Sequence, residues 1–234
     1  VQNALCISVD MPDFPKVLAL AEAYENLYAS VGTHPDYEDT PEPSVEELVL
    51  LSSHPKVLAV GETGLDYYRM GDRTYEQMEW QRERFRTHIR AAIEVGKPLI
   101  VHTRSASSDT MKILKEEGAA QVGGVMHCFT ESWEVAQEAM DIGFYISFSV
   151  IVTFKSAKQR RVVHDESLRH WSASHTPFGL RFTTTNLDAG CLHIFLRITR
   201  AFRQHVCVWM WLLVFPNRVF CFRREKIKLV IWVH

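Results

Sequence analysis

The chain has 234 residues, enough to bury the core of one large domain or of two small ones. With 47% hydrophobic residues, 23% charged residues and a formal net charge of −2, it gives no indication of nucleic-acid binding through overall positive charge. We expect no membrane segment, because the longest apolar run, residues 206–215, is about half of the roughly 20 residues that a membrane helix needs.

Charge divides the sequence into two unlike parts. Residues 1–159 hold 14 basic and 24 acidic residues, whereas residues 160–234 hold 12 basic and 4 acidic residues. The five cysteines form no CxxC pair, so we expect reduced thiols in an intracellular, cytoplasmic protein. The first residue is Val1, with neither an initiator Met nor a signal peptide, which predicts a fragment or a processed chain.

Apolar runs of strand length alternate with segments of helical period along residues 1–159. Ser44 with Glu47 three residues later predicts a helix start, and Gly96 predicts a helix end. Arg82, Arg84, Arg86 and Arg90 lie on one predicted helix among Glu76, Glu79 and Glu83, which predicts a solvated helix face with i,i+4 pairs. The predicted strands are Ala4–Val9, Leu27–Gly32, Val57–Gly61, Leu99–His102, Gly123–Phe129 and Phe144–Val152, and the predicted helices are Phe14–Tyr24, Val45–Ser53, Arg73–Val95, Ser107–Glu117 and Ser132–Ile142.

This alternation predicts an α/β fold with a parallel sheet. About six recognisable strands suit an incomplete (β/α)8 TIM-type barrel, and an open doubly wound sheet is the alternative. No GxGxxG or GxxxxGK[ST] loop is present, which argues against the nucleotide-binding folds.

Residues 160–234 show no such alternation and stay unassigned. Val206–Phe215 and Lys228–Val233 are possible strands, and Leu192–Arg203 is a possible helix. If the barrel is incomplete, Val206–Phe215 is the natural segment to cover its open edge.

An acid and two histidines each close a short apolar run: Glu62, His102 and His127. Parallel strands present such residues together at the carboxyl edge of the sheet, and imidazole and carboxylate are good ligands for divalent metals. Taken singly, each of these residues is more often a loop or capping residue. Cys128 follows His127 and, by alternation along a strand, should point away from it.

Five segments in the same order and spacing resemble the TatD family of metal-dependent deoxyribonucleases, which are amidohydrolase-like metallohydrolases with a (β/α)8 barrel. They are VGTHP at 31–35, VGETGLDYY at 60–68, KPLIVHTR at 97–104, GGVMHCFT at 123–130 and GFYISFS at 143–149.

The resemblance implies hydrolysis of DNA at a site of two divalent metals, such as Mg, Mn or Zn. It implies that Glu62 bridges the metals and that His102 and His127 are further ligands, the three together being the catalytic residues. His34, Asp66 and Arg104 lie in family-like positions that imply contacts with the substrate, Arg104 with a phosphate.

Two family motifs are missing from this sequence. The family's first strand carries a His-x-His pair and its eighth a Glu-Thr-Asp-Ser-Pro-like motif, so about half of the implied ligands are present. We therefore predict a partial barrel at 1–159 with impaired activity and a divergent tail at 160–234, produced by a shifted reading frame, a retained intron or alternative splicing. The alternatives are a non-catalytic, binding-only remnant and a related hydrolase of amides or esters. Nothing in the sequence indicates the oligomeric state.

Overall fold

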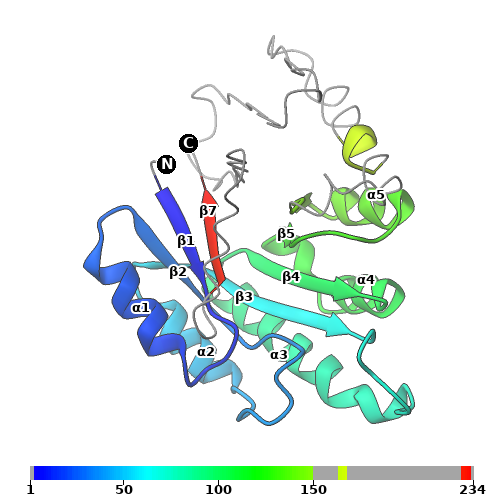
Figure 1. Cartoon of the computed structure of the whole chain (residues 1–234), viewed down its shortest axis with the longest axis horizontal. Coiled ribbons are helices and arrows are strands. Elements are labelled where there is room, and N and C mark those ends of the chain that lie inside the picture. Colours follow the sequence, from blue (N-terminus) through cyan, green and yellow to red (C-terminus); the bar gives the residue numbers. More distant parts are fainter. Residues whose placement is uncertain (1–2, 150–162, 168–227, 233–234) are drawn as a thin grey trace, which may run out of the picture.

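The computed structural model describes residues 3–149, 163–167 and 228–232. Within this part, strands β1 to β6 alternate with helices α1 to α5, and the curled sheet forms part of a barrel with helices packed on its outer side (Figure 1). The strands are β1 Asn3–Ile7, β2 Leu27–Val31, β3 Val57–Asp66, β4 Leu99–Arg104, β5 Gly124–Met126, β6 Phe144–Ile146 and β7 Lys228–Trp232, and the α-helices are α1 Phe14–Ala23, α2 Val45–Ser52, α3 Glu79–Val95, α4 Ser107–Glu116 and α5 Trp133–Asp141.

The strand order decides between the two predicted folds. The order is β6-β5-β4-β3-β2-β1-β7, and β1 to β6 pair in parallel with their sequence neighbours. A doubly wound sheet reverses its strand order at a switch point, and β1 to β6 contain no reversal. The prediction of an incomplete TIM-type barrel is confirmed, and the doubly wound alternative is wrong.

Several predicted boundaries need correction. β3 continues through Asp66 instead of ending at Gly61, so the run predicted as a turn belongs to the strand. α3 begins at Glu79, after a 3-10 turn at Glu76–Met78, and not at Arg73. β5 and β6 are shorter than predicted, and β4 extends to Arg104.

The helix ends follow their capping residues. Ser44 Oγ accepts a hydrogen bond from the backbone N–H of Glu47 at 3.1 Å, as predicted for the start of α2. Gly96 ends α3 in the left-handed conformation with φ 65°.

An apolar cluster on the inner face of the sheet lies below the predicted site. Side chains alternate between the faces of a strand, so Ile100 shares its face of β4 with His102. The carboxyl end of β4 therefore presents the His102 imidazole on the inner side, and His127, directly after β5, lies beside it at Glu62. The inner cluster consists of Leu5, Ile7, Ala59, Ile100 and Val125.

One tail segment is part of the sheet. β7 lies antiparallel to β1, with Leu5 opposite Val230, and covers the β1 edge (Figure 1). Of the two predicted tail strands, this confirms Lys228–Val233, one residue shorter. Val206–Phe215 and Leu192–Arg203 lie outside the described residues.

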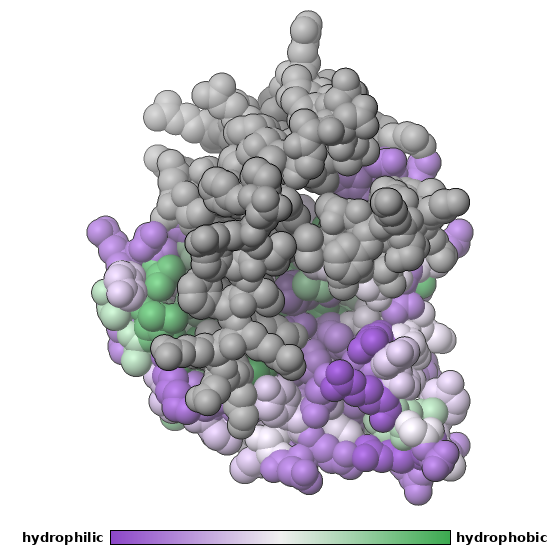
Figure 2. Space-filling model, in the orientation of Figure 1, coloured by the Kyte–Doolittle hydropathy of each residue, from purple (hydrophilic) through white to green (hydrophobic). Residues whose placement is uncertain are grey.

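The described surface is mainly hydrophilic along the lower edge of the view, and an apolar area lies beside α1 (Figure 2). Among the described helices, none is both long enough and apolar enough to cross a membrane.

Candidate functional site

Glu62 owes its position to an irregularity in β3. Between the pairs Val60↔Leu99 and Thr63↔Val101, β3 has one residue more than β4, which is a β-bulge. The N–H of Glu62 bonds to the carbonyl of Ser8 at 3.0 Å instead of joining the ladder with β4. Bulges redirect side chains near active sites. Here the bulge holds a carboxylate that is 1% exposed.

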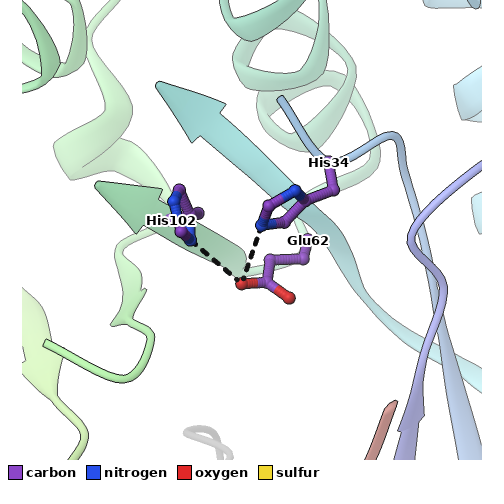
Figure 3. Close-up of side chains that lie close together, drawn as sticks. All are labelled: His34, Glu62 and His102. Atoms are coloured by element: carbon purple, nitrogen blue, oxygen red, sulfur yellow. Dashed lines mark ion pairs between the residues drawn. The ribbon is translucent and has the colours of Figure 1, made fainter. Parts of the chain in front are cut away.

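Three imidazoles surround one oxygen of this carboxylate. His127 Nδ1 lies 3.0 Å, His102 Nδ1 3.5 Å and His34 Nε2 3.7 Å from Glu62 Oε1. Figure 3 shows the rings of His34, on the loop after β2, and His102, on β4, pointing at the same oxygen. Four of the six predicted site residues thus converge on one point.

Asp66, the fifth predicted residue, contacts His102 from the other side of the ring. Its Oδ2 lies 2.9 Å from His102 Nε2, while His102 Nδ1 faces Glu62. Carboxylates that bind the outer nitrogen of an imidazole fix its tautomer and leave the inner nitrogen for a metal. The geometry gives Asp66 this orienting contact, and its predicted contact with the substrate stays a prediction.

His127 has a neighbour that the sequence misplaces. Cys128 has φ 50°, and its Sγ lies 3.4 Å from His127 Nε2. The prediction that Cys128 points away is wrong, because β5 ends at Met126 and strand alternation no longer applies at residues 127 and 128.

The carboxylate of Glu62 and the imidazoles around it shift one another's pKa values. Burial raises the pKa of Glu62, but the nearby His127 and His34 and the hydrogen bonds of His102 and His127 lower it well below its usual range. Burial lowers the pKa of His102, whereas its bonds to Asp66 and Glu62 raise it, to about 9. Burial likewise opposes protonation of His127, but the charge of Glu62 and the contact with Cys128 raise its pKa to about 10. A metal cation bound here would replace these protons.

The distances around His34 suit a metal ligand, but its hydrogen bonding points to another role. His34, Glu62 and His102 offer ligand atoms within 4.8 Å of one another and form the one group of this kind among the described residues. However, His34 Nδ1 accepts a hydrogen bond from the N–H of Asp36 at 3.1 Å. A neutral ring that accepts at Nδ1 carries its proton on Nε2, the atom that faces Glu62. The hydrogen bonding therefore favours a donor over a metal ligand at His34, in keeping with its predicted contact with the substrate.

A family model described as TatD related DNase matches residues 1–171. The chain belongs to this family.

Individual TatD relatives cover the same region. The chain is 44% identical over 167 residues to the metal-dependent hydrolase YabD of Bacillus subtilis, covering 71% of this chain and 64% of that protein. It is 29% identical over 150 residues to the 3'-5' ssDNA/RNA exonuclease TatD of Klebsiella pneumoniae, covering 64% and 56%. The chain thus spans less than two thirds of the length of these curated relatives.

A solved structure supports the barrel assignment. The crystal structure of YJJV, a TatD homologue from Escherichia coli, superposes with a TM-score of 0.63 at 31% sequence identity, covering 70% of this chain and 62% of that one. The family and the half-barrel fold agree with the expectations from the sequence.

The donor set fits the divalent metals that a TatD protein implies. A buried carboxylate and imidazole nitrogens suit Zn, Mn, Fe or Co, and the outer nitrogen of His102 already has its carboxylate partner. The predicted set of ligands was Glu62, His102 and His127. The geometric group contains His34 in place of His127, although His127 lies closest to Glu62.

Arg104, the last predicted site residue, does not join the group around Glu62 Oε1. Its guanidinium carbon lies 3.6 Å above the centre of the Tyr68 ring. Burial raises the pKa of Asp66, whereas His102, the N–H of Tyr68 and finally the charge of Arg104 lower it below its usual value. The predicted phosphate contact of Arg104 stays a prediction.

A buried polar stripe on α3 anchors the loops that carry His34 and Asp66. Gln81 accepts a hydrogen bond from the N–H of Asp66 at 3.0 Å and donates to the carbonyl of Pro35 at 3.2 Å. Arg84 donates to the carbonyls of His34 and Tyr37, at 3.2 and 2.8 Å.

The third member of this stripe, His88, is fully buried and binds the loop one residue earlier. Its Nε2 accepts from the N–H of Thr33 at 3.0 Å, and its Nδ1 lies 2.8 Å from the carbonyl of Arg84. Residues 81, 84 and 88 share one helix face with the buried Phe85. This spacing is the feature of the sequence from which their burial could have been predicted. The prediction of a solvated face is wrong for Arg84, which is buried and pairs with Glu42.

Proposed function

We propose that the site catalyses metal-dependent hydrolysis of phosphodiester bonds in DNA. The observation that carries this proposal is the convergence of three imidazoles on the buried Glu62 Oε1, at 3.0 to 3.7 Å. Membership in the TatD related DNase family supports the reaction class.

The proposal assigns a role to each side chain. Glu62, His102 and His127 hold divalent metal, which when bound neutralises phosphate charge and activates water. Asp66 fixes the orientation of His102, because its carboxylate binds the outer nitrogen at 2.9 Å and leaves the inner nitrogen facing the metal site. His34 donates a hydrogen bond from its Nε2–H group to an oxygen of the substrate.

We also propose that this 234-residue chain turns over more slowly than its longer relatives. The proposal assigns three ligands among the described residues, Glu62, His102 and His127, whereas a pair of metals needs more donors to complete both coordination shells.

The test compares the chain with its Glu62→Gln variant on labelled single-stranded DNA with Mn²⁺ or Mg²⁺. Calorimetric titration with Mn²⁺ is expected to give an affinity at least about tenfold lower in the variant, since the carboxylate charge is lost. Glu117→Gln is the matched control, because Glu117 belongs to an ion-pair cluster between α3 and α4.

Turnover that depends on Mn²⁺ and is lost in Glu62→Gln but not in Glu117→Gln would support the proposal. Metal or DNA binding without turnover would favour the binding-only alternative. Hydrolysis of amide or carboxylic ester substrates in place of DNA would point to a related metallohydrolase.

A further inference from the structure

An aromatic ring and a guanidinium form a flat surface beside the site. Arg104 stacks on Tyr68 at 3.6 Å, and Tyr68 nevertheless remains 64% exposed. An exposed Tyr–Arg contact contributes little to stability. The exposed ring is thus available for contacts with a ligand.

The two side chains are held on the strands that carry the site. Asp66 pairs with Arg104 in the β3–β4 ladder, and the N–H of Tyr67 bonds to the carbonyl of Arg104 at 2.9 Å. The N–H of Tyr68 bonds to Asp66 Oδ1 at 2.9 Å, while Asp66 Oδ2 contacts His102. One carboxylate therefore links the backbone of Tyr68 to the proposed metal ligand His102.

Among the described residues, Arg104 is the cation that lies over the Tyr68 ring. The two other arginines of this loop pair with acids of the loop after β2: Arg69 with Asp36 at 3.4 Å and Arg73 with Glu38 at 2.6 Å. These pairs also connect the loop of Tyr68 to the loop that follows His34.

We propose that Tyr68 and Arg104 form a stacking subsite for a nucleobase of a single-stranded nucleic acid. The inference rests on the proposed function and names the substrate feature that the site recognises. A flat ring next to a cation is how proteins bind single strands, because every base has a π-face and every linkage a negative phosphate. A base of a duplex, already stacked on both faces, would not fit this role.

The experiment measures binding apart from catalysis. Fluorescence anisotropy with a labelled single-stranded octamer in EDTA gives affinity without metal-dependent turnover. Tyr68→Ala is expected to bind about tenfold more weakly, and Tyr68→Phe to stay within about twofold of the parent. Tyr24→Ala is the matched control, because Tyr24 is also exposed, at 56%, and follows α1 at the amino end of β2.

An abasic octamer of equal length should bind the parent chain as weakly as the normal octamer binds Tyr68→Ala. DNA and RNA octamers should respond alike, since both present base faces. Unchanged affinity in Tyr68→Ala, equal binding of the abasic octamer, or a loss confined to DNA or to RNA would overturn the subsite.

Failure of the proposed function gives a different result. If the parent chain shows no metal-dependent turnover but Tyr68→Ala still loses affinity for both octamers, the subsite stands and the reaction does not. If turnover depends on Glu62 while Tyr68→Ala binds normally, the reaction stands and the subsite is wrong.

Discussion

Gly64 gives the site room between β3 and β4. Its φ is +131°, and a Cβ at this position would lie 2.0 Å from the carbonyl oxygen of His102. That oxygen belongs to the backbone of the neighbouring strand, so no side-chain rotation can relieve the overlap. The absence of a side chain at residue 64 thus lets the strands approach where His102 meets Glu62.

Gly64→Ala is expected to lower the free energy of unfolding by at least about 3 kcal/mol, from the backbone conformation and the contact together. Gly71→Ala is the matched control: its φ is +63°, and a Cβ there meets nothing within 4 Å. It should cost about 1 kcal/mol. Urea unfolding of the three proteins checks the difference, and similar losses in both variants would contradict the steric argument.

His88 predicts how stability depends on pH. Burial lowers its pKa to about 4, against which the hydrogen bond to the carbonyl of Arg84 is insufficient. A lowered pKa means that the folded state binds the proton less well than the unfolded state. The contribution to stability is therefore full above pH 6.5 and is lost as the pH falls toward 4.

Between pH 7.5 and 5 this loss should reach about 2 kcal/mol in the parent chain and be absent in His88→Gln. Gln carries an acceptor and a donor for Thr33 and Arg84 but does not titrate. All other ionisable groups are shared, so their effects cancel in the comparison of urea unfolding curves at the two pH values. An equal acid-induced loss in both proteins would show that His88 is not its source.

At the scale of elements, α3 holds two site loops through Gln81. The amide oxygen of Gln81 accepts from Asp66, and its nitrogen donates to the carbonyls of Pro35 and Asp66, at 3.2 and 3.3 Å. Gln81→Glu keeps the shape but turns a negative oxygen toward two carbonyl oxygens. We expect a loss of about 2 kcal/mol at pH 7.5, much of it recovered at pH 5 as the carboxyl gains a proton.

Denaturant unfolding at both pH values measures this effect. Gln77→Glu is the control, because Gln77 is exposed and uses only its oxygen, which accepts from the N–H of Thr74 at 2.8 Å. Equal free energies of unfolding for Gln81→Glu and the parent at pH 7.5 would show that the side-chain N–H bonds of Gln81 do not contribute to stability.

The elements also show what the sequence could predict. Alternation and capping residues indicated each α-helix and strand from β1 to β6, because these elements have an apolar period and a clear stop. The β3 bulge escaped prediction, since it arises from pairing with a strand far away in the sequence. The polar stripe on α3 escaped for a related reason: whether Arg84 is solvated or buried depends on the loops packed against it.

For the whole molecule, one edge of the sheet is paired with a segment outside residues 1–171, the range that the family model matches. β7 pairs with β1 along five residues, Asn3 to Ile7, and gives that strand a second neighbour. Without such a neighbour β1 would be an unprotected edge. The site around Glu62 and the covered edge of β1 belong to the same sheet. We expect metal to bind, and therefore to stabilise the protein, only when the chain folds with both of these features formed.

If metal binds only to the folded sheet, thermal unfolding should be cooperative and its melting temperature should rise with Mn²⁺. A ligand that binds only the folded state adds about 2.7 kcal/mol at a hundred times its Kd, which corresponds to about 5–10 °C for a chain of this size. EDTA should reverse the shift, and Glu62→Gln should show little of it, whereas Glu117→Gln should behave like the parent. A cooperative melt that ignores Mn²⁺ would mean that this chain folds without holding metal, as the binding-only alternative requires. A broad transition without cooperativity would indicate that β7 does not compensate for an unclosed barrel.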